Sequence, residues 1–165
     1  MCFYNNKEEI IKNLVKIYNK LKEQGILIMI GLRITYKCVF ELPPNKNILI
    51  NKFNKLCNDK CKLTVGARAI TKHSDRSKFL NKNESIKFWG IVVGNEEERN
   101  TRSNLICLDL LANSSWITIF DLNIYTRIIE IRNTLGYGLR WEYINNYLDI
   151  EFKGAIEPQI STFNN

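Results

Sequence analysis

The sequence lacks the features that would direct a chain into or across a membrane. Its longest apolar run, Ile26–Ile30, is far shorter than the ~20 residues that a membrane-spanning helix needs. The N-terminus has neither the long apolar core nor the small-residue cleavage region of a signal peptide. We therefore expect a cytoplasmic protein with no membrane partner.

A disulfide framework is also missing. The chain has 5 cysteines, an odd number without paired spacing, so we expect reduced thiols in the cytosol. Cys57 and Cys61 have a C-x-x-x-C spacing, but no second Cys/His pair follows at zinc-finger distance, although His73 could in principle be a third ligand. The sequence therefore favours neither a metal nor another cofactor, and it leaves metal binding by Cys57 and Cys61 open.

The motifs of the common enzyme classes are absent as well. The chain has no G-x-x-x-x-G-K-[ST] phosphate loop, no G-x-G-x-x-G after a strand, no G-x-S-x-G elbow and no H-E-x-x-H. His73 is the only histidine, so any chemistry that needs an imidazole must use it. A lone histidine is more often structural or a donor to a phosphate. We therefore expect no catalytic residues and no small-molecule substrate.

The sequence has an excess of positive charge, and this charge is unevenly distributed along the chain. Residues 1–90 carry 18 Lys/Arg and 7 Asp/Glu, whereas residues 91–165 carry 6 and 10, for a net charge of +7. A basic half beside an acidic half indicates a polyanionic partner on one side of the protein. The alternative is that the many lysines reflect a compositional bias, but such a bias does not account for the arginines.

The densest basic segment covers residues 68–78. It contains five basic residues or histidines: Arg68, Lys72, His73, Arg76 and Lys78. If the segment is helical, Arg68, Lys72 and Arg76 stand at i, i+4 and i+8 on one face, a spacing suited to successive phosphates. The alternative is a solvated helix face on which Asp75 partly neutralises Arg76.

Hydrophobic periodicity divides the chain into helices and strands. Helices are expected over residues 6–24, about 45–57 and 96–112, a polar loop over 74–86, and strands over 26–32, 35–42, 62–67, 88–93, 116–122, 126–133, 138–144 and 148–156. Asn145-Asn146 favours a tight turn, so the last two strands should pair antiparallel. We therefore predict a single α+β domain over residues 1–165, with a mostly antiparallel sheet and helices packed on one side.

Aromatic residues and a glycine-rich turn mark further candidate positions. Trp116 and Trp141 alternate in phase with apolar neighbours and are expected in the core, whereas Trp89 follows the basic segment and could stack on a base. Two glycines surround Tyr137 and permit backbone angles that other residues resist. Arg140 should therefore project from a fixed turn.

Several short motifs occur together between residues 65 and 159. They are Gly66-Ala67-Arg68-Ala69, Lys72-His73, Arg76, Phe88-Trp89-Gly90, Trp116-Ile117, Glu130-Ile131-Arg132, Gly136-Tyr137-Gly138-Leu139-Arg140-Trp141 and Phe152-x-Gly154-x-x-Glu157-Pro158-Gln159. This combination resembles the microsporidian dormancy factor family. The resemblance implies a non-enzymatic, ribosome-bound factor that contacts ribosomal RNA and ribosomal proteins near the exit site, excludes transfer RNA and keeps idle ribosomes inactive.

The resemblance also implies an RNA-binding role for the basic segment and the glycine-rich turn. Phosphate contacts would come from Arg68, Lys72, Arg76 and Lys78. His73 would donate a hydrogen bond or stack, and Tyr137 with Arg140 would present flat groups to an unstacked base.

Two other functions stay open at this point. The chain could be an enzyme acting on RNA or on a nucleotide, with His73 and Arg140 at its site. It could also be a cap-binding-like or protein-interaction module in which an exposed Trp89 takes a base, a cap or a peptide.

Overall fold

The structure is a computed structural model that describes residues 5–29, 32, 37–79 and 88–158. The described helices are α1 (Asn5–Met29), α2 (Lys46–Phe53), α3 (Val65–Phe79) and α5 (Glu96–Ala112). The described strands are β1 (Leu56–Asn58), β2 (Cys61–Thr64), β3 (Trp116–Asn123), β4 (Thr126–Arg132), β5 (Gly138–Ile144) and β6 (Asp149–Ile156).

Strands β3 to β6 form one antiparallel sheet in which each strand pairs with the next along the chain. Ile129 pairs with Trp141 and Ile131 with Leu139, so one face of the central strands is apolar. On the other face Glu130 pairs with Arg140. Strand alternation therefore separates a core face from a charged face, as the sequence pattern predicts.

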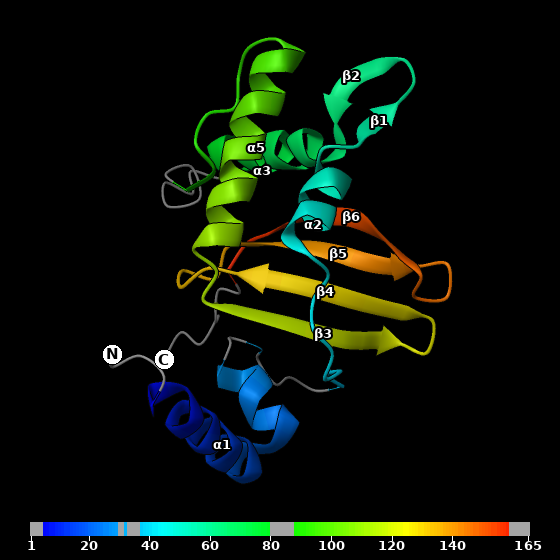
Figure 1. The fold of residues 1–165 in the computed structure, drawn as a ribbon. Helices are drawn as coiled ribbons and strands as arrows, with labels where there is room; N and C mark the ends of the chain where they lie inside the picture. The colour runs from blue at the N-terminus through cyan, green and yellow to red at the C-terminus, as the bar shows by residue number, and fades with distance from the viewer. Residues whose placement is uncertain (1–4, 30–31, 33–36, 80–87, 159–165) are drawn as a thin grey trace, which may run out of the picture.

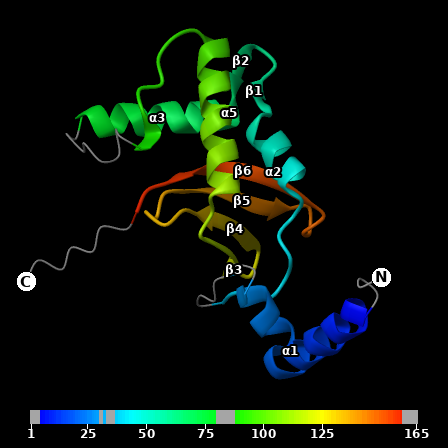
Figure 2. The same cartoon turned by 60° about the vertical axis from the view of Figure 1, so that its left-hand side comes forward.

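Helices α2, α3 and α5 lie on one side of the sheet, and α1 lies beyond β3, away from them (Figures 1 and 2). Strands β1 and β2 form a separate two-stranded hairpin beside α2 (Figure 1). The predicted α+β class, with a mostly antiparallel sheet and helices packed on one side, is confirmed. The expectation that residues 1–165 form one domain stays a prediction.

The core fills the space between the apolar face of the sheet and these helices. Its largest fully buried side chains include Trp89, Trp141, Phe53, Leu49, Ile70 and Leu110. Each large side chain of this kind stabilises the fold by about 1.5–3 kcal/mol when it leaves water. Cys107 on α5 is also fully buried, and this burial raises the pKa of its thiol to about 12.

Helix α5 begins at a capping box that the sequence encodes locally. The Asn95 side chain accepts from the Glu98 backbone N–H, and the Glu98 carboxylate accepts from the Asn95 backbone N–H. Three glutamates in the first turn also favour the positive end of the helix dipole. These local signals explain why the expected helix over residues 96–112 is confirmed.

Four of the expected strands are wrong in whole or in part. Of the strand expected over residues 35–42, the described residues 37–42 form only an isolated bridge from Cys38 to Phe120. Residues 26–29 continue α1, and residues 65–67 begin α3 instead of ending a strand. Residues 88–89 form a helical turn and residues 90–93 form no strand. The expected loop is wrong for residues 74–79, which end α3. Residues 30–31, 35–36 and 80–86 of these expected segments lie outside the described residues.

Within the described part of the chain, every helix is too short or too polar to cross a membrane.

Gly66, near the start of α3, lies directly against the ring of Phe53 at the end of α2. A Cβ added at Gly66 would lie 2.3 Å from a ring carbon of Phe53, whose side chain is fully buried. We predict that Gly66→Ala lowers the free energy of unfolding by about 1–3 kcal/mol, because the ring must move within a packed core. Urea denaturation measures this change. Lys72→Ala, at an exposed position of the same helix, should change stability by less than about 0.5 kcal/mol, and a more stable Gly66→Ala variant would contradict the packing.

Candidate active site

A histidine and a carboxylate meet where the chain leaves β6 and passes α3. His73 Nδ1 lies 3.1 Å from Glu157 Oε1, and the two side chains are 18% and 25% exposed. When Glu157 is ionised, Nδ1 carries the hydrogen and donates it, which leaves the lone pair on Nε2. Such a pair holds an imidazole in one orientation for proton transfer.

Helix α3 places His73 at the boundary between the core and solvent. Ala67, Ile70 and Ser74 form the buried side of the helix, because they recur at helical spacing. The Ser74 hydroxyl donates to the Gly90 carbonyl at 2.6 Å and so ties the helix to the segment after Trp89. His73 lies at the edge of this buried side.

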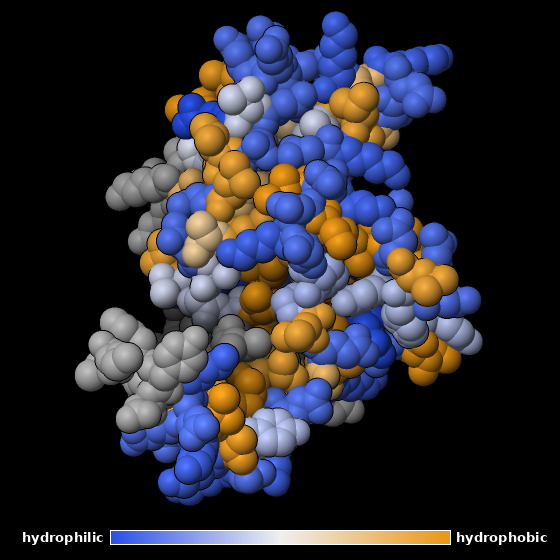
Figure 3. Space-filling view, in the orientation of Figure 1, coloured by the Kyte–Doolittle hydropathy of each residue, from blue (hydrophilic) through white to orange (hydrophobic). Residues whose placement is uncertain are grey.

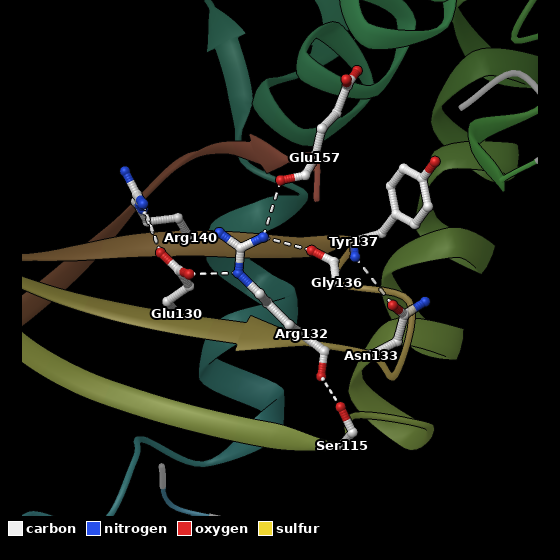
Figure 4. A network of polar contacts seen from close by, with 8 residues as sticks. All are labelled: Ser115, Glu130, Arg132, Asn133, Gly136, Tyr137, Arg140 and Glu157. Carbon is white, nitrogen blue, oxygen red and sulfur yellow. Dashed lines mark hydrogen bonds and ion pairs between the residues drawn. The ribbon is translucent and has the colours of Figure 1, made fainter. Parts of the chain in front are cut away.

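Arg132 fixes the backbone that carries Glu157. Its guanidinium, on a side chain only 9% exposed, donates to the carbonyl oxygens of Gly136 and Glu157, the latter at 3.0 Å (Figure 4). Its carbonyl oxygen accepts from the Ser115 backbone N–H at 2.8 Å. One arginine at the end of β4 therefore joins the start of β3, the β4–β5 turn and the chain after β6.

Glu130 supplies the counter-charge for Arg132 and for a second arginine. Glu130 Oε1 accepts from Arg132 Nε at 2.6 Å, and Oε2 accepts from Arg140 Nη2 at 2.6 Å (Figure 4). The Glu130 side chain is 6% exposed and that of Arg140 is 38% exposed. The three residues together carry one net positive charge, and Arg140 is its solvent-facing member.

The β4–β5 turn is fixed by side chain and backbone together. Asn133 Oδ1 accepts from the backbone N–H groups of Leu135 and Tyr137, and Gly136 has φ +87°. A Cβ added at Gly138 would lie 2.1 Å from the Ile131 carbonyl oxygen. Gly136 is therefore needed for its backbone angle, whereas Gly138 is needed for close approach.

An aromatic cluster lies beside His73. Tyr137 stacks on Phe88 with ring centroids 4.1 Å apart, and Trp89 meets both rings edge-on. The His73 ring lies 5.7 Å from the Trp89 ring. Trp89 is fully buried and Tyr137 is 5% exposed.

This burial corrects the expectation that Trp89 is exposed. A buried Trp89 cannot take a base or a cap, so the interaction-module hypothesis loses its binding residue. The Tyr137 ring stacks on Phe88 and meets Trp89 edge-on, and RNA binding by Tyr137 stays a prediction. Both residues shape the wall beside His73.

The basic residues predicted to bind RNA separate into three groups. Arg68 and Lys72 are exposed on α3, one helical turn apart. Arg76 and Lys78 lie in the last turns of α3, and their side chains are outside the described part of the structure. Arg140 lies on β5 with Glu130. RNA binding by these residues and by His73 stays a prediction.

Sequence reasoning missed Glu157, Glu130 and Arg132 as site residues. Glu157 is separated from His73 by 84 positions, so no local spacing links them. Glu130 and Arg132 share one strand face, and in an antiparallel register that face meets Arg140. A search of the predicted strands for oppositely charged residues that face one another would have found Glu130, Arg132 and Arg140.

Metal ligands do not gather in the described residues, since no three His, Cys, Asp or Glu side chains lie together there. Burial raises the pKa of the Cys57 thiol, and the charge of neighbouring Cys61 raises it further. A raised pKa disfavours the thiolate that a metal would require.

The fold and the site together define a small α+β domain with a histidine–carboxylate pair beside an exposed basic helix face. The family model of the CdiA C-terminal tRNase toxin domain matches residues 54–157, well over half of the chain. The chain belongs to this family. The match ends at Glu157 and contains every residue of the site described above. Comparisons with curated proteins and with solved structures found no match.

Family membership corrects the expectations that the dormancy-factor resemblance supplied. The resemblance to the microsporidian dormancy factor family is wrong, because the same motifs, apart from Pro158-Gln159, lie within a match to a toxin-domain family. Ribosome binding, exit-site occupancy and ribosome hibernation are therefore wrong as well. The expectation of a non-enzymatic factor is also wrong, since the family is one of tRNases.

The buried charges predict a specific loss of stability. Glu130→Gln leaves Arg132 in the interior without its counter-charge, so we expect the free energy of unfolding to fall by about 3–5 kcal/mol. Glu151→Gln on β6 is the matched control, because Glu151 pairs with Lys55 at 3.5 Å on the surface, and the control should cost under ~1 kcal/mol. Equal losses in urea denaturation would contradict the role of Glu130.

Proposed function

We propose that the protein is a ribonuclease that cleaves transfer RNA with His73 as its proton-transfer residue. The contact between His73 Nδ1 and Glu157 Oε1 carries this proposal, because it orients the only imidazole of the chain at a partly exposed position. The family supports the choice of transfer RNA as substrate. Transfer RNA is cytoplasmic, so the proposed site of action is the cytoplasm.

RNA can be cleaved by its own 2′-hydroxyl group. In the proposed reaction His73 Nε2 takes the 2′ proton while the O2′–P bond forms and the P–O5′ bond breaks. The 5′ oxygen leaves with a proton from water, the hydroxide that remains takes the proton back from His73, and the other product is a 2′,3′-cyclic phosphate. Glu157 holds the ring through Nδ1 and offsets the positive charge that His73 gains.

The surface around His73 suits a negatively charged polymer. Arg68 and Lys72 lie exposed on the same helix as His73. Arg140 has a partly exposed guanidinium, but it lies on the charged face of the sheet, away from the helices. Phosphate contacts from such residues orient a nucleic acid without reading its sequence. We assign backbone binding to Arg68 and Lys72 and proton transfer to His73, so an enzyme acting on RNA replaces the proposed binding factor.

Substitution of the two dyad residues separates proton transfer from folding. We predict that His73→Gln lowers the rate of transfer RNA cleavage by at least about 100-fold, the usual worth of a general base. Glu157→Gln should lower it by a similar or smaller factor, because the imidazole loses its orienting partner. Cleavage is measured under single-turnover conditions. Glu151→Gln is the control, because it makes the same substitution at a surface position on β6, and this variant should cut at the wild-type rate. A fully active His73→Gln variant would refute the assignment.

Arg132 is a positioning residue in this proposal. Arg132→Lys keeps the charge but cannot place two fixed donors on the Gly136 and Glu157 carbonyls, so we predict about a tenfold or larger loss in kcat with KM little changed. Arg127 provides the control, since it lies on the same strand, is 16% exposed and bonds to two carboxylates, Asp121 and Glu41.

The variants Arg132→Lys and Arg127→Lys together distinguish a positioning role of Arg132 from a purely structural one. Both should lose stability, but Arg127→Lys should retain kcat. Equal kcat losses in the two variants, after correction for the folded fraction, would show that Arg132 acts through stability alone.

A further inference from the structure

A surface hollow lies next to the aromatic cluster, on the side of α5. It has a volume of about 460 Å³ and is lined by Phe88, Arg102, Leu105, Ile106 and Asp109. Apolar side chains are visible over α5 among hydrophilic ones (Figure 3). The hollow thus combines an apolar floor with one cationic and one anionic side chain.

The two charged groups at the hollow are available to a ligand. Arg102 makes no hydrogen bond or ion pair within the described residues, and its Nη2 atom would lie 2.7 Å from a Cβ added at Gly90. Gly90 has φ +67° and no side chain, so it leaves room for the guanidinium. Asp109 Oδ1 accepts from the Asn113 side chain, and Oδ2 has no partner in the same described part.

The apolar floor is open where it lies on α5. Leu105 is 61% exposed, although it is a large apolar residue. Phe88 is half-buried, with one ring face covered by Tyr137, so its other face or its edge lines the hollow. A flat ligand could lie against this floor.

The buried Trp89 ring lies between the hollow and the candidate active site. Phe88 and Trp89 have ring centroids 4.8 Å apart, and Trp89 lies next to His73. Two ring contacts therefore separate the floor of the hollow from the imidazole.

We infer that this hollow binds one unpaired nucleobase of the RNA, next to the phosphate that His73 acts on. A nucleobase has flat faces that stack on apolar and aromatic side chains, acceptor atoms for Arg102 and amino groups for Asp109. An apolar peptide would leave both charges without partners. The inference rests on the proposed function for the choice of RNA as ligand.

Binding of an uncleavable RNA tests this inference directly. The probe is a set of single-stranded hexanucleotides with 2′-O-methyl ribose throughout, which lacks the 2′ nucleophile, and with an abasic residue at each position in turn. Affinity for the full chain is measured by fluorescence anisotropy. We expect one abasic position to weaken binding by about tenfold, since stacking of one base is worth on the order of that factor.

Variants of the hollow should remove this dependence on one base. Leu105→Glu and Arg102→Gln should weaken binding of the intact probe by about tenfold and make it insensitive to the abasic position. The matched controls are Leu108→Glu and Arg99→Gln, which lie on the same helix outside the hollow, and both should behave as wild type. Equal sensitivity at all positions, or equal effects of Leu105→Glu and Leu108→Glu, would overturn the inference.

Measurements of base-dependent binding and of transfer RNA cleavage together distinguish this inference from the proposed function. A base-dependent site in a protein that leaves transfer RNA intact would refute the proposed ribonuclease and support the base site. Cleavage of transfer RNA without any base-dependent binding would support the ribonuclease and refute the base site.

Discussion

The site depends on one buried ion pair, Glu130 with Arg132. A buried guanidinium is tolerated only when its charge is balanced and its donors are bonded, and Arg132 meets both conditions through Glu130 and the carbonyls of Gly136 and Glu157. These bonds hold the β4–β5 turn and the chain after β6 at fixed positions. The placement of Glu157 beside His73 follows from them, so an interaction on the charged side of the sheet determines geometry on the helical side.

Much of the fold could be predicted because its signals are local. Alternating apolar residues predict β3 to β6, and Asn145 and Asn146 both have positive φ in the turn between the last two strands, as the Asn-Asn pair predicts. The failures have local causes too. Thr64 caps α3 with a hydrogen bond from the Ala67 N–H, a signal that the β-rich sequence around Val65 conceals. Of the site, the basic helix face was predictable, whereas the His73–Glu157 contact is a product of tertiary packing.

The motifs that suggested a dormancy factor mainly encode structure. Gly136 provides a left-handed turn, Gly138 allows close approach to β4, and Trp141 donates from its indole to the Leu49 carbonyl within the core. Such residues identify a fold and say little about its chemistry, because function depends on the groups placed upon it. The family match over residues 54–157 corrects the function while leaving the predicted α+β class intact.

In the proposed reaction, the oriented imidazole of His73 activates the 2′-hydroxyl group of transfer RNA to cut the strand. The most direct test is to incubate the purified protein with transfer RNA and to determine the chemistry of the new ends. Cleavage by the 2′-hydroxyl group gives a discrete cut with a 2′,3′-cyclic phosphate on one fragment and a 5′-hydroxyl group on the other. Intact transfer RNA, or fragments with 5′-phosphate and 3′-hydroxyl ends, would contradict the proposed reaction.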